Sequence, residues 1–197
     1  MARETEQVRS FFLESLSAHD SGPRAHGWGS EDSQNVRFQV LTEVGDLRGK
    51  SLLDVGCGQG YLLDYLKHRG VGTYYCGLDL LPEMVERART RHPEARFEVG
   101  DILNGWDEPF DYVLCSGLNN VDTGRNLETF TRLISRLWEI VRIAGAVNAL
   151  SACAPVKDPR SYYAQPEEAF REARKLTPRV VLRHDYRPND FSLYLYR

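Results

Sequence analysis

Residues 51–60 read Ser-Leu-Leu-Asp-Val-Gly-Cys-Gly-Gln-Gly, an apolar run followed directly by three glycines at alternate positions. The apolar run predicts a buried strand over 51–55, and the apolar spacing of residues 61–66 predicts a helix just after the glycines. Glycines permit positive φ angles and a close approach of a ligand to the backbone. Free N–H groups at the start of the helix favour the same use. The sequence therefore predicts a ligand-binding turn between a strand and a helix.

Strands and helices alternate along most of the chain. Further strands are predicted over residues 73–79, 95–99, 111–116 and 144–151. Helices are predicted over residues 8–16, 36–44, 127–141 and 166–176, and from Pro82 onward. This alternation predicts an α/β fold with a doubly wound, mostly parallel sheet and helices on both faces. Ligands of such sheets bind at the carboxyl ends of the strands.

The C-terminal segment has a different pattern. Residues 179–186 and 191–196 are strand-like, and Arg187-Pro-Asn-Asp190 between them is rich in turn formers. These features predict an antiparallel hairpin that closes the sheet. Because no linker or repeat interrupts the chain, we expect a single domain over 1–197. Residues 46–197 would form its core, and residues 1–45 a helical cap or lid segment.

The composition indicates a soluble globular protein, with 42% hydrophobic and 27% charged residues. The net charge is −3 and the arginines are scattered, which argues against a nucleic-acid partner. The first residues lack the apolar core of a signal peptide, and the longest apolar-leaning run, 144–155, is too short to span a bilayer. We therefore expect a cytoplasmic protein without membrane association, as a monomer or homodimer.

The chain has four cysteines: Cys57, Cys76, Cys115 and Cys153. They show no C-x-x-C spacing, and no pair of histidines accompanies them at zinc-ligand spacing. Each lies in or beside an apolar run, so we expect small, buried, reduced side chains and no metal site.

Acidic residues accompany the predicted strand ends. Asp54 precedes the glycine turn, and Gly60 comes one residue too early for the dinucleotide pattern G-x-G-x-x-G. A carboxylate beside the turn disfavours a pyrophosphate and suits a ligand with an ammonium and a sulfonium group. Asp79 ends the second strand, where an acid accepts hydrogen bonds from the ribose of NAD or S-adenosylmethionine (SAM) alike. Asp101 follows the third strand and can accept a hydrogen bond from an adenine amine.

Four ordered motifs carry a resemblance to a known family. They are Asp54-Val-Gly-Cys-Gly-Gln-Gly60, Gly77-Leu-Asp-Leu-Leu-Pro-Glu-Met84, Gly100-Asp-Ile102 and Phe110-Asp-Tyr-Val-Leu114. Over residues 35–197 the chain resembles the class I SAM-dependent methyltransferases. The resemblance implies a Rossmann-like, seven-stranded sheet with an antiparallel last strand, SAM as cofactor and S-adenosylhomocysteine (SAH) as product.

The resemblance also implies a set of SAM-binding residues at the strand ends. The methionine and ribose portion of SAM would lie beside Asp54, Gly56, Cys57, Gly58, Gly60 and Ser116, with Asp54 near the methionine amine. Asp79 would hold the ribose hydroxyls. The adenine would contact Leu80, Asp101 and the backbone of Ile102. Leu81 departs from the family, which often has a Ser or Thr helix cap there, a cap worth about 1 kcal/mol.

The segment before the second helix is rich in glycine and contains Trp28, a large apolar side chain that needs burial. We expect residues 19–37 to close over the cofactor as a lid, with Trp28 against SAM. Arg37 has two interpretations. It is either a fork donor to the SAM carboxylate or an arginine on a helix surface.

No residue is identified as a catalytic base. Candidates are His19 and His26 in the glycine-rich segment, and Tyr162 and Tyr163 in the long connection after the fifth strand. The two tyrosines either cover an acceptor or pack on the sheet. His92, near a predicted helix end, is expected at the surface.

These observations favour one function and leave two alternatives. The preferred function is SN2 transfer of a methyl group from SAM to a small-molecule acceptor, for which alignment and exclusion of water supply much of the catalysis. The alternatives are a non-catalytic SAM-binding regulator or scaffold, and an NAD-linked oxidoreductase.

Overall fold

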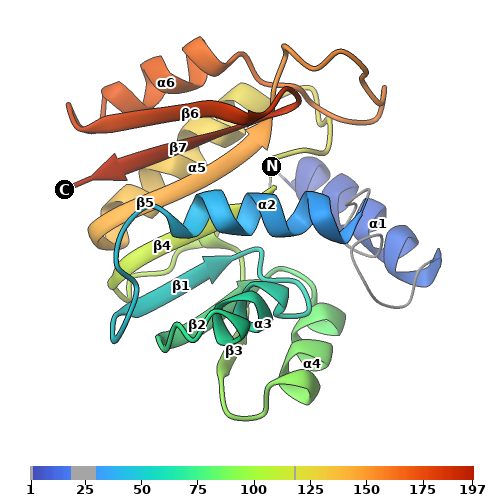
Figure 1. Cartoon of the computed structure of the whole chain (residues 1–197). Coiled ribbons are helices and arrows are strands. Elements are labelled where there is room, and N and C mark those ends of the chain that lie inside the picture. Colours follow the sequence, from blue (N-terminus) through green and yellow to red (C-terminus); the bar gives the residue numbers. More distant parts are fainter. Residues whose placement is uncertain (1, 19–29, 118) are drawn as a thin grey trace.

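The computed structural model describes residues 2–18, 30–117 and 119–197, which build one seven-stranded sheet (Figure 1). The strands are β1 (Ser51–Val55), β2 (Tyr74–Asp79), β3 (Arg96–Val99), β4 (Phe110–Ser116), β5 (Val141–Leu150), β6 (Val180–Arg187) and β7 (Asp190–Tyr196). Their order across the sheet is β3-β2-β1-β4-β5-β7-β6. Strands β1 to β5 are parallel, and β7 is antiparallel to both β5 and β6. The predicted fold class and its C-terminal hairpin are confirmed.

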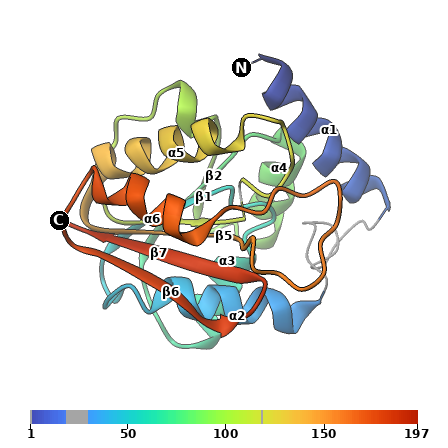
Figure 2. The same ribbon diagram turned by 90° about the horizontal axis from the view of Figure 1, so that it is seen from above.

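Helices cover both faces of the sheet (Figure 2). They are α1 (Ala2–Ala18), α2 (Glu31–Thr42), α3 (Tyr61–His68), α4 (Pro82–Arg91), α5 (Asn126–Ile140) and α6 (Pro166–Arg174), with a 3-10 turn η2 (Ile102–Asn104). Apolar side chains of α5 and α6 pack on one face, and those of α2, α3 and α4 pack on the other. Within the described ranges, no helix is long and apolar enough to cross a membrane.

The alternation of side chains along β1 divides them between the two helical layers. Leu53 and Val55 belong to the core under α5 and α6, whereas Leu52 belongs to the core under α2 and α3. Asp54 shares the parity of Leu52 and is hydrogen-bonded on that side, to Tyr75. This alternation decides which strand-end residues can reach a ligand.

The border between α5 and β5 differs from its predicted position. The helix ends at Ile140 and the strand begins at Val141, three residues before the predicted start at 144. Apolar spacing could not separate the two elements, because Ile140 and Val141 are both buried. Pairing of Val141 with Phe110 of β4 fixes the strand start, and such pairing is invisible to a local pattern.

Three of the four cysteines are buried as predicted, but Cys153 is exposed. The prediction for Cys153 was wrong because β5 ends at Leu150, and the chain leaves the sheet before the cysteine. Among the described residues, no group of three or more His, Cys, Asp or Glu side chains is arranged to hold a metal ion.

Candidate active site

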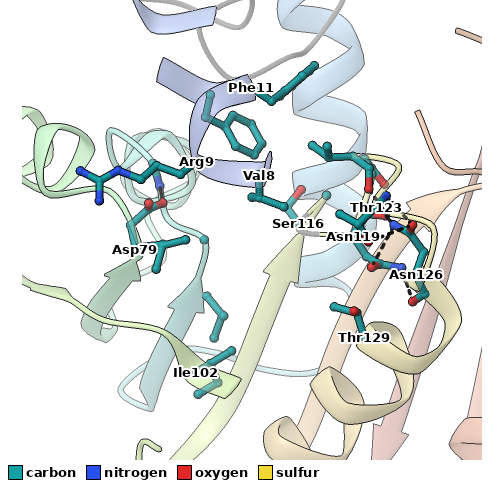
Figure 3. Close-up of a pocket in the computed structure, with 18 of the residues that line it drawn as sticks. Val8, Arg9, Phe11, Asp79, Ile102, Ser116, Asn119, Thr123, Asn126 and Thr129 are labelled. Atoms are coloured by element: carbon teal, nitrogen blue, oxygen red, sulfur yellow. Dashed lines mark hydrogen bonds between the residues drawn. The ribbon is translucent and has the colours of Figure 1, made fainter. Parts of the chain in front are cut away.

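A cavity of about 980 Å³ lies at the carboxyl ends of the parallel strands. The turns after β1, β2 and β3 form one wall, and α1 lies across the opening from them (Figures 1 and 3). The loop after β4, the start of α2 and the tip of the β6–β7 hairpin complete it. The N-terminal segment and the loop after β5, at Asp158, Ser161 and Tyr163, therefore both contribute to one cavity.

The glycine turn after β1 adopts the conformation that its sequence predicts. Gly56, Gly58 and Gly60 have φ angles of 74°, 53° and 80°, which only glycine adopts readily. Gly56 and Gly58 line the cavity, whereas Cys57 and Gly60 are buried behind it. The Gly60 backbone instead packs closely against the protein, because a Cβ there would lie 2.9 Å from His92.

His92 is 3% exposed, so the prediction of a surface position was wrong. Its ring stacks on Phe97, and its Nδ1 lies 2.9 Å from Lys67 Nζ. The helix end that carries His92 folds back against the glycine turn, a contact that position along a helix does not indicate.

Asp79 connects the glycine turn to the start of α4. Its carboxylate accepts hydrogen bonds from Gly58 N at 2.8 Å and from Leu81 N at 2.9 Å. Removal from water raises the pKa of Asp79, while these two N–H donors lower it. Leu81 provides no side-chain cap to α4, as its sequence predicts. Asp79 lines the cavity, and each of its oxygens retains acceptor capacity for a ligand.

Asp54 does not line the cavity. Its side chain is 3% exposed and accepts a hydrogen bond of 2.6 Å from the Tyr75 hydroxyl on the α2–α3 side of the sheet. This position corrects the expectation that its carboxylate lies beside a bound amine. The alternation of side chains along β1 contained the signal, since Asp54 has the parity of the core residue Leu52.

Exchange of Asp54 for asparagine is expected to change how stability depends on pH. Burial raises the pKa of Asp54 to about 7, although the hydrogen bond from Tyr75 lowers it. Between roughly pH 4 and pH 7 the folded protein therefore keeps a proton that the unfolded chain loses. The free energy of unfolding of the unsubstituted protein should fall through this window by on the order of 2–4 kcal/mol.

Asp54→Asn lacks this titration and should lose less stability as the pH rises. Urea unfolding of both proteins at about pH 4.5 and about pH 8 measures the difference. The same pH dependence in the two proteins would contradict a raised Asp54 pKa.

The adenine-side candidates lie together at the ends of β2 and β3. Leu80, Asp101 and Ile102 line the cavity beside Asp79. Asp101 Oδ1 accepts a hydrogen bond from Leu103 N at 2.9 Å, so the carboxylate also caps η2.

Ser116 lines the cavity at the end of β4. Its Oγ accepts a hydrogen bond of 3.3 Å from Asn148 Nδ2, and Asn148 Oδ1 accepts one of 2.8 Å from Gly117 N. This buried asparagine of β5 holds the turn that follows β4.

The structure rules out one of the two interpretations of Arg37. It is 4% exposed, so it is not a helix-surface arginine. Its Nε and Nη2 lie 2.9 and 2.7 Å from Asp190 Oδ1, and its Nη1 donates to Ser33 O at 2.8 Å. Arg37 does line the cavity, and direct contact with a SAM carboxylate stays a prediction.

The two tyrosines of the loop after β5 have different surroundings. Tyr162 packs against the core under α5 and α6, whereas Tyr163 lines the cavity. The Tyr163 hydroxyl accepts a hydrogen bond of 2.8 Å from Asp158 N.

Three N-terminal candidates cannot be placed. His19, His26 and Trp28 lie outside the described residues, and the lid that they were expected to form stays a prediction.

Comparison with known proteins decides the family. Residues 52–139, which include the glycine turn, Asp79 and Asp101, match the family described as the methyltransferase domain. The provisionally named methyltransferase Rv1506c of Mycobacterium tuberculosis is 34% identical over 152 residues, which is 73% of this chain and 90% of that protein. The chain belongs to the class I SAM-dependent methyltransferase family.

Two further proteins are similar to this methyltransferase. The phthiotriol/phenolphthiotriol dimycocerosates methyltransferase of Mycobacterium tuberculosis is 33% identical over 134 residues, 66% of this chain but 45% of the larger protein. The solved structure of the DhpI–SAH complex superposes with a TM-score of 0.71 at 17% identity, covering 98% of this chain and 97% of that one. This likeness extends the shared fold over nearly the whole methyltransferase.

The methyltransferase cavity has an apolar wall that the sequence analysis did not assign to the site. Val8, Phe11 and Phe12 of α1 line the cavity, and Figure 3 shows Val8 and Phe11 facing the strand ends. Their helical spacing indicated an apolar face, but the sequence could not show what that face covers. Farther along α1, Leu16 packs against Leu81 and Met84, which anchors the helix beside α4.

A second wall that the sequence did not reveal comes from the loop between β4 and α5. Asn126 Nδ2 donates to Val121 O at 2.7 Å, and its Oδ1 accepts from Thr123 N at 2.8 Å (Figure 3). Asn119 Nδ2 donates to Asn126 O at 3.2 Å. These side chains line the cavity and fix the loop that borders Ser116.

Proposed function

We propose that this methyltransferase binds SAM in the cavity at the strand ends and transfers its methyl group to a small-molecule acceptor in the same cavity. The observation that carries the proposal is the joint position of the glycine turn, Asp79 and Asp101. They follow three neighbouring strands and line one cavity. The magnesium protoporphyrin IX methyltransferase ChlM of Synechocystis PCC 6803 and the protein DhpI, which share the fold, were solved with SAH bound.

The residues present fit SAM. Gly56 and Gly58 expose backbone to the cavity without a Cβ, which suits the methionine and ribose portion. Asp79 offers carboxylate oxygens to the ribose hydroxyls. Leu80 and Ile102 offer apolar surface to the adenine. Asp101 and Ser116 would meet the two ends of the cofactor, as the family motifs imply.

SAM supplies both the methyl group and its leaving group. The protein must therefore orient the acceptor and exclude water. In this proposal the apolar face of α1 excludes water, because it covers the strand ends. Tyr163 is the candidate for orienting the acceptor, since its oxygen accepts the Asp158 N–H and its own proton can be donated to a ligand.

The cavity volume supports a small acceptor, because about 300–1,000 Å³ is typical of small-molecule sites and this cavity of about 980 Å³ must also hold the cofactor. The name of ChlM, magnesium protoporphyrin IX methyltransferase, likewise describes a small-molecule acceptor for that protein. A cytoplasmic location and a monomeric or homodimeric state remain our predictions.

Calorimetry with SAM, SAH and NAD tests the cofactor. SAM and SAH are expected to bind with micromolar affinity and NAD not to bind, because the glycine turn departs from the dinucleotide pattern. Binding of NAD without binding of SAM would overturn the proposal. Incubation with labelled SAM and a metabolite extract then separates an enzyme from a SAM-binding regulator, which would bind but leave all metabolites unlabelled.

A further inference from the structure

The hairpin tip at one end of the cavity places two guanidinium groups around one carboxylate. Arg37 binds Asp190 Oδ1 at 2.7 and 2.9 Å, and Arg187 Nε lies 3.4 Å from Asp190 Oδ2. Asp190 is 1% exposed and Arg37 is 4% exposed. The Arg187 side chain is 32% exposed, and the charges of the three groups sum to one positive charge.

Among these three residues, Arg187 is the one that can still donate hydrogen bonds to a ligand. Its Nε is directed at Asp190 and also donates to Asn189 Oδ1 at 3.4 Å. Within residues 2–18, 30–117 and 119–197, its two Nη atoms have no hydrogen-bond partner. Arg187 and Asn189 line the cavity. A guanidinium held at Nε in this way can offer both Nη atoms to one planar or tetrahedral anion.

Two other charged residues that line the cavity, Arg125 and Asp158, have partners of opposite charge. Arg125 pairs with Glu128 at 2.5 Å, and Asp158 pairs with Arg160 at 2.9 Å. The two guanidinium groups around Asp190 therefore carry one positive charge that this carboxylate does not balance. A partly buried positive charge is costly unless an anion pairs with it, and a ligand in the cavity can provide that anion.

The position of Arg187 separates it from the cofactor residues. The candidate SAM residues at the strand ends follow β1, β2, β3 and β4, whereas Arg187 ends β6. Arg37 is the exception among the described candidate SAM residues, because it binds the same Asp190. Four strand spacings separate β1 from β6, which is roughly 19 Å. Arg187 therefore faces the half of the cavity that SAM leaves to the acceptor.

We propose that Arg187 binds an anionic group of the methyl acceptor, a carboxylate or a phosphate, and so selects acidic small molecules as substrates. Asp190, which is itself bound by Arg37, positions Arg187 through the ion pair with its Nε. This inference rests on the proposed function, since it divides the cavity between SAM and an acceptor. A neutral analogue of the acceptor would leave the Arg187 charge unpaired and should bind less tightly.

The test uses benzoate and inorganic phosphate as probes of the anion site. Calorimetry measures their binding to the SAH-saturated protein and to the protein alone. We expect at least one probe to bind with millimolar affinity and Arg187→Gln to weaken it by at least about tenfold. Arg187→Lys keeps the positive charge but lacks the two Nη donors of the guanidinium. It should therefore weaken probe binding less than Arg187→Gln does. SAH affinity should stay unchanged in both variants.

Arg179→Gln is the matched control, because Arg179 is exposed just before β6, at the opposite end of the same hairpin, and does not line the cavity. It should bind the probes like the unsubstituted protein. Absence of probe binding, or equal binding by Arg187→Gln, would overturn the proposal. Loss of SAH binding in Arg187→Gln would also overturn it, by assigning Arg187 to the methionine carboxylate. Failure of SAH to bind the unsubstituted protein would instead contradict the proposed function, and the titrations without SAH would still test the anion site.

Discussion

Asp190→Ala is expected to lower the free energy of unfolding by about 3–5 kcal/mol. Asp190 pairs with the buried Arg37 at 2.7 Å and joins β7 to the middle of α2. Without this carboxylate, the buried Arg37 guanidinium would lose the opposite charge that lies 2.7 Å from it. Urea denaturation, followed by circular dichroism, measures the loss.

Asp185→Ala is the control for Asp190→Ala. Asp185 lies in the same hairpin and pairs with Arg183 at 2.7 Å, but it is exposed, so its removal should leave the unfolding curve nearly unchanged. The double variant Arg37→Met/Asp190→Leu should recover most of the stability, because it removes both charges from the interior. Equal losses of unfolding free energy in Asp185→Ala and Asp190→Ala would contradict this prediction. They would show that burial does not increase the contribution of the Arg37–Asp190 pair to stability.

Asp79→Ala is expected to weaken SAH binding by roughly tenfold to a hundredfold, since hydrogen bonds to a charged group contribute about 1.5–3 kcal/mol. The substitution also removes the acceptor for Gly58 N and Leu81 N. The glycine turn would lose its connection to α4, and this loosening should add to the loss of ribose contacts. Calorimetry with SAH on the folded variant measures the effect.

Asp111→Ala serves as the matched control for Asp79→Ala. The Asp111 carboxylate also accepts a backbone hydrogen bond, from Ser51 N at 3.0 Å, but it lies near the amino ends of β1 and β4. Its removal should leave SAH binding unchanged. If Asp79→Ala folds and binds SAH as tightly as Asp111→Ala does, Asp79 is not part of the cofactor site.

The sequence by itself determined those features of this methyltransferase that depend on residues close together in the chain. Strand and helix periods predicted the alternating sheet, because side-chain direction repeats every two or 3.6 residues. The glycines after β1 predicted a turn with positive φ angles, which Gly56, Gly58 and Gly60 adopt. The position of Asp79 at a strand end predicted a carboxylate at the ligand edge, and it lines the cavity.

Only the tertiary structure decided which distant residues meet. Arg37 and Asp190 are 153 residues apart, and they pair because β7 inserts beside β5 while α2 covers that side of the sheet. The same insertion brings Arg187, predicted only as part of a turn, to the cavity wall. Local periodicity cannot reveal such contacts, because they depend on the order of strands in space. Burial and charge pairing are fixed by that order, and with them the position of Arg187 at the cavity.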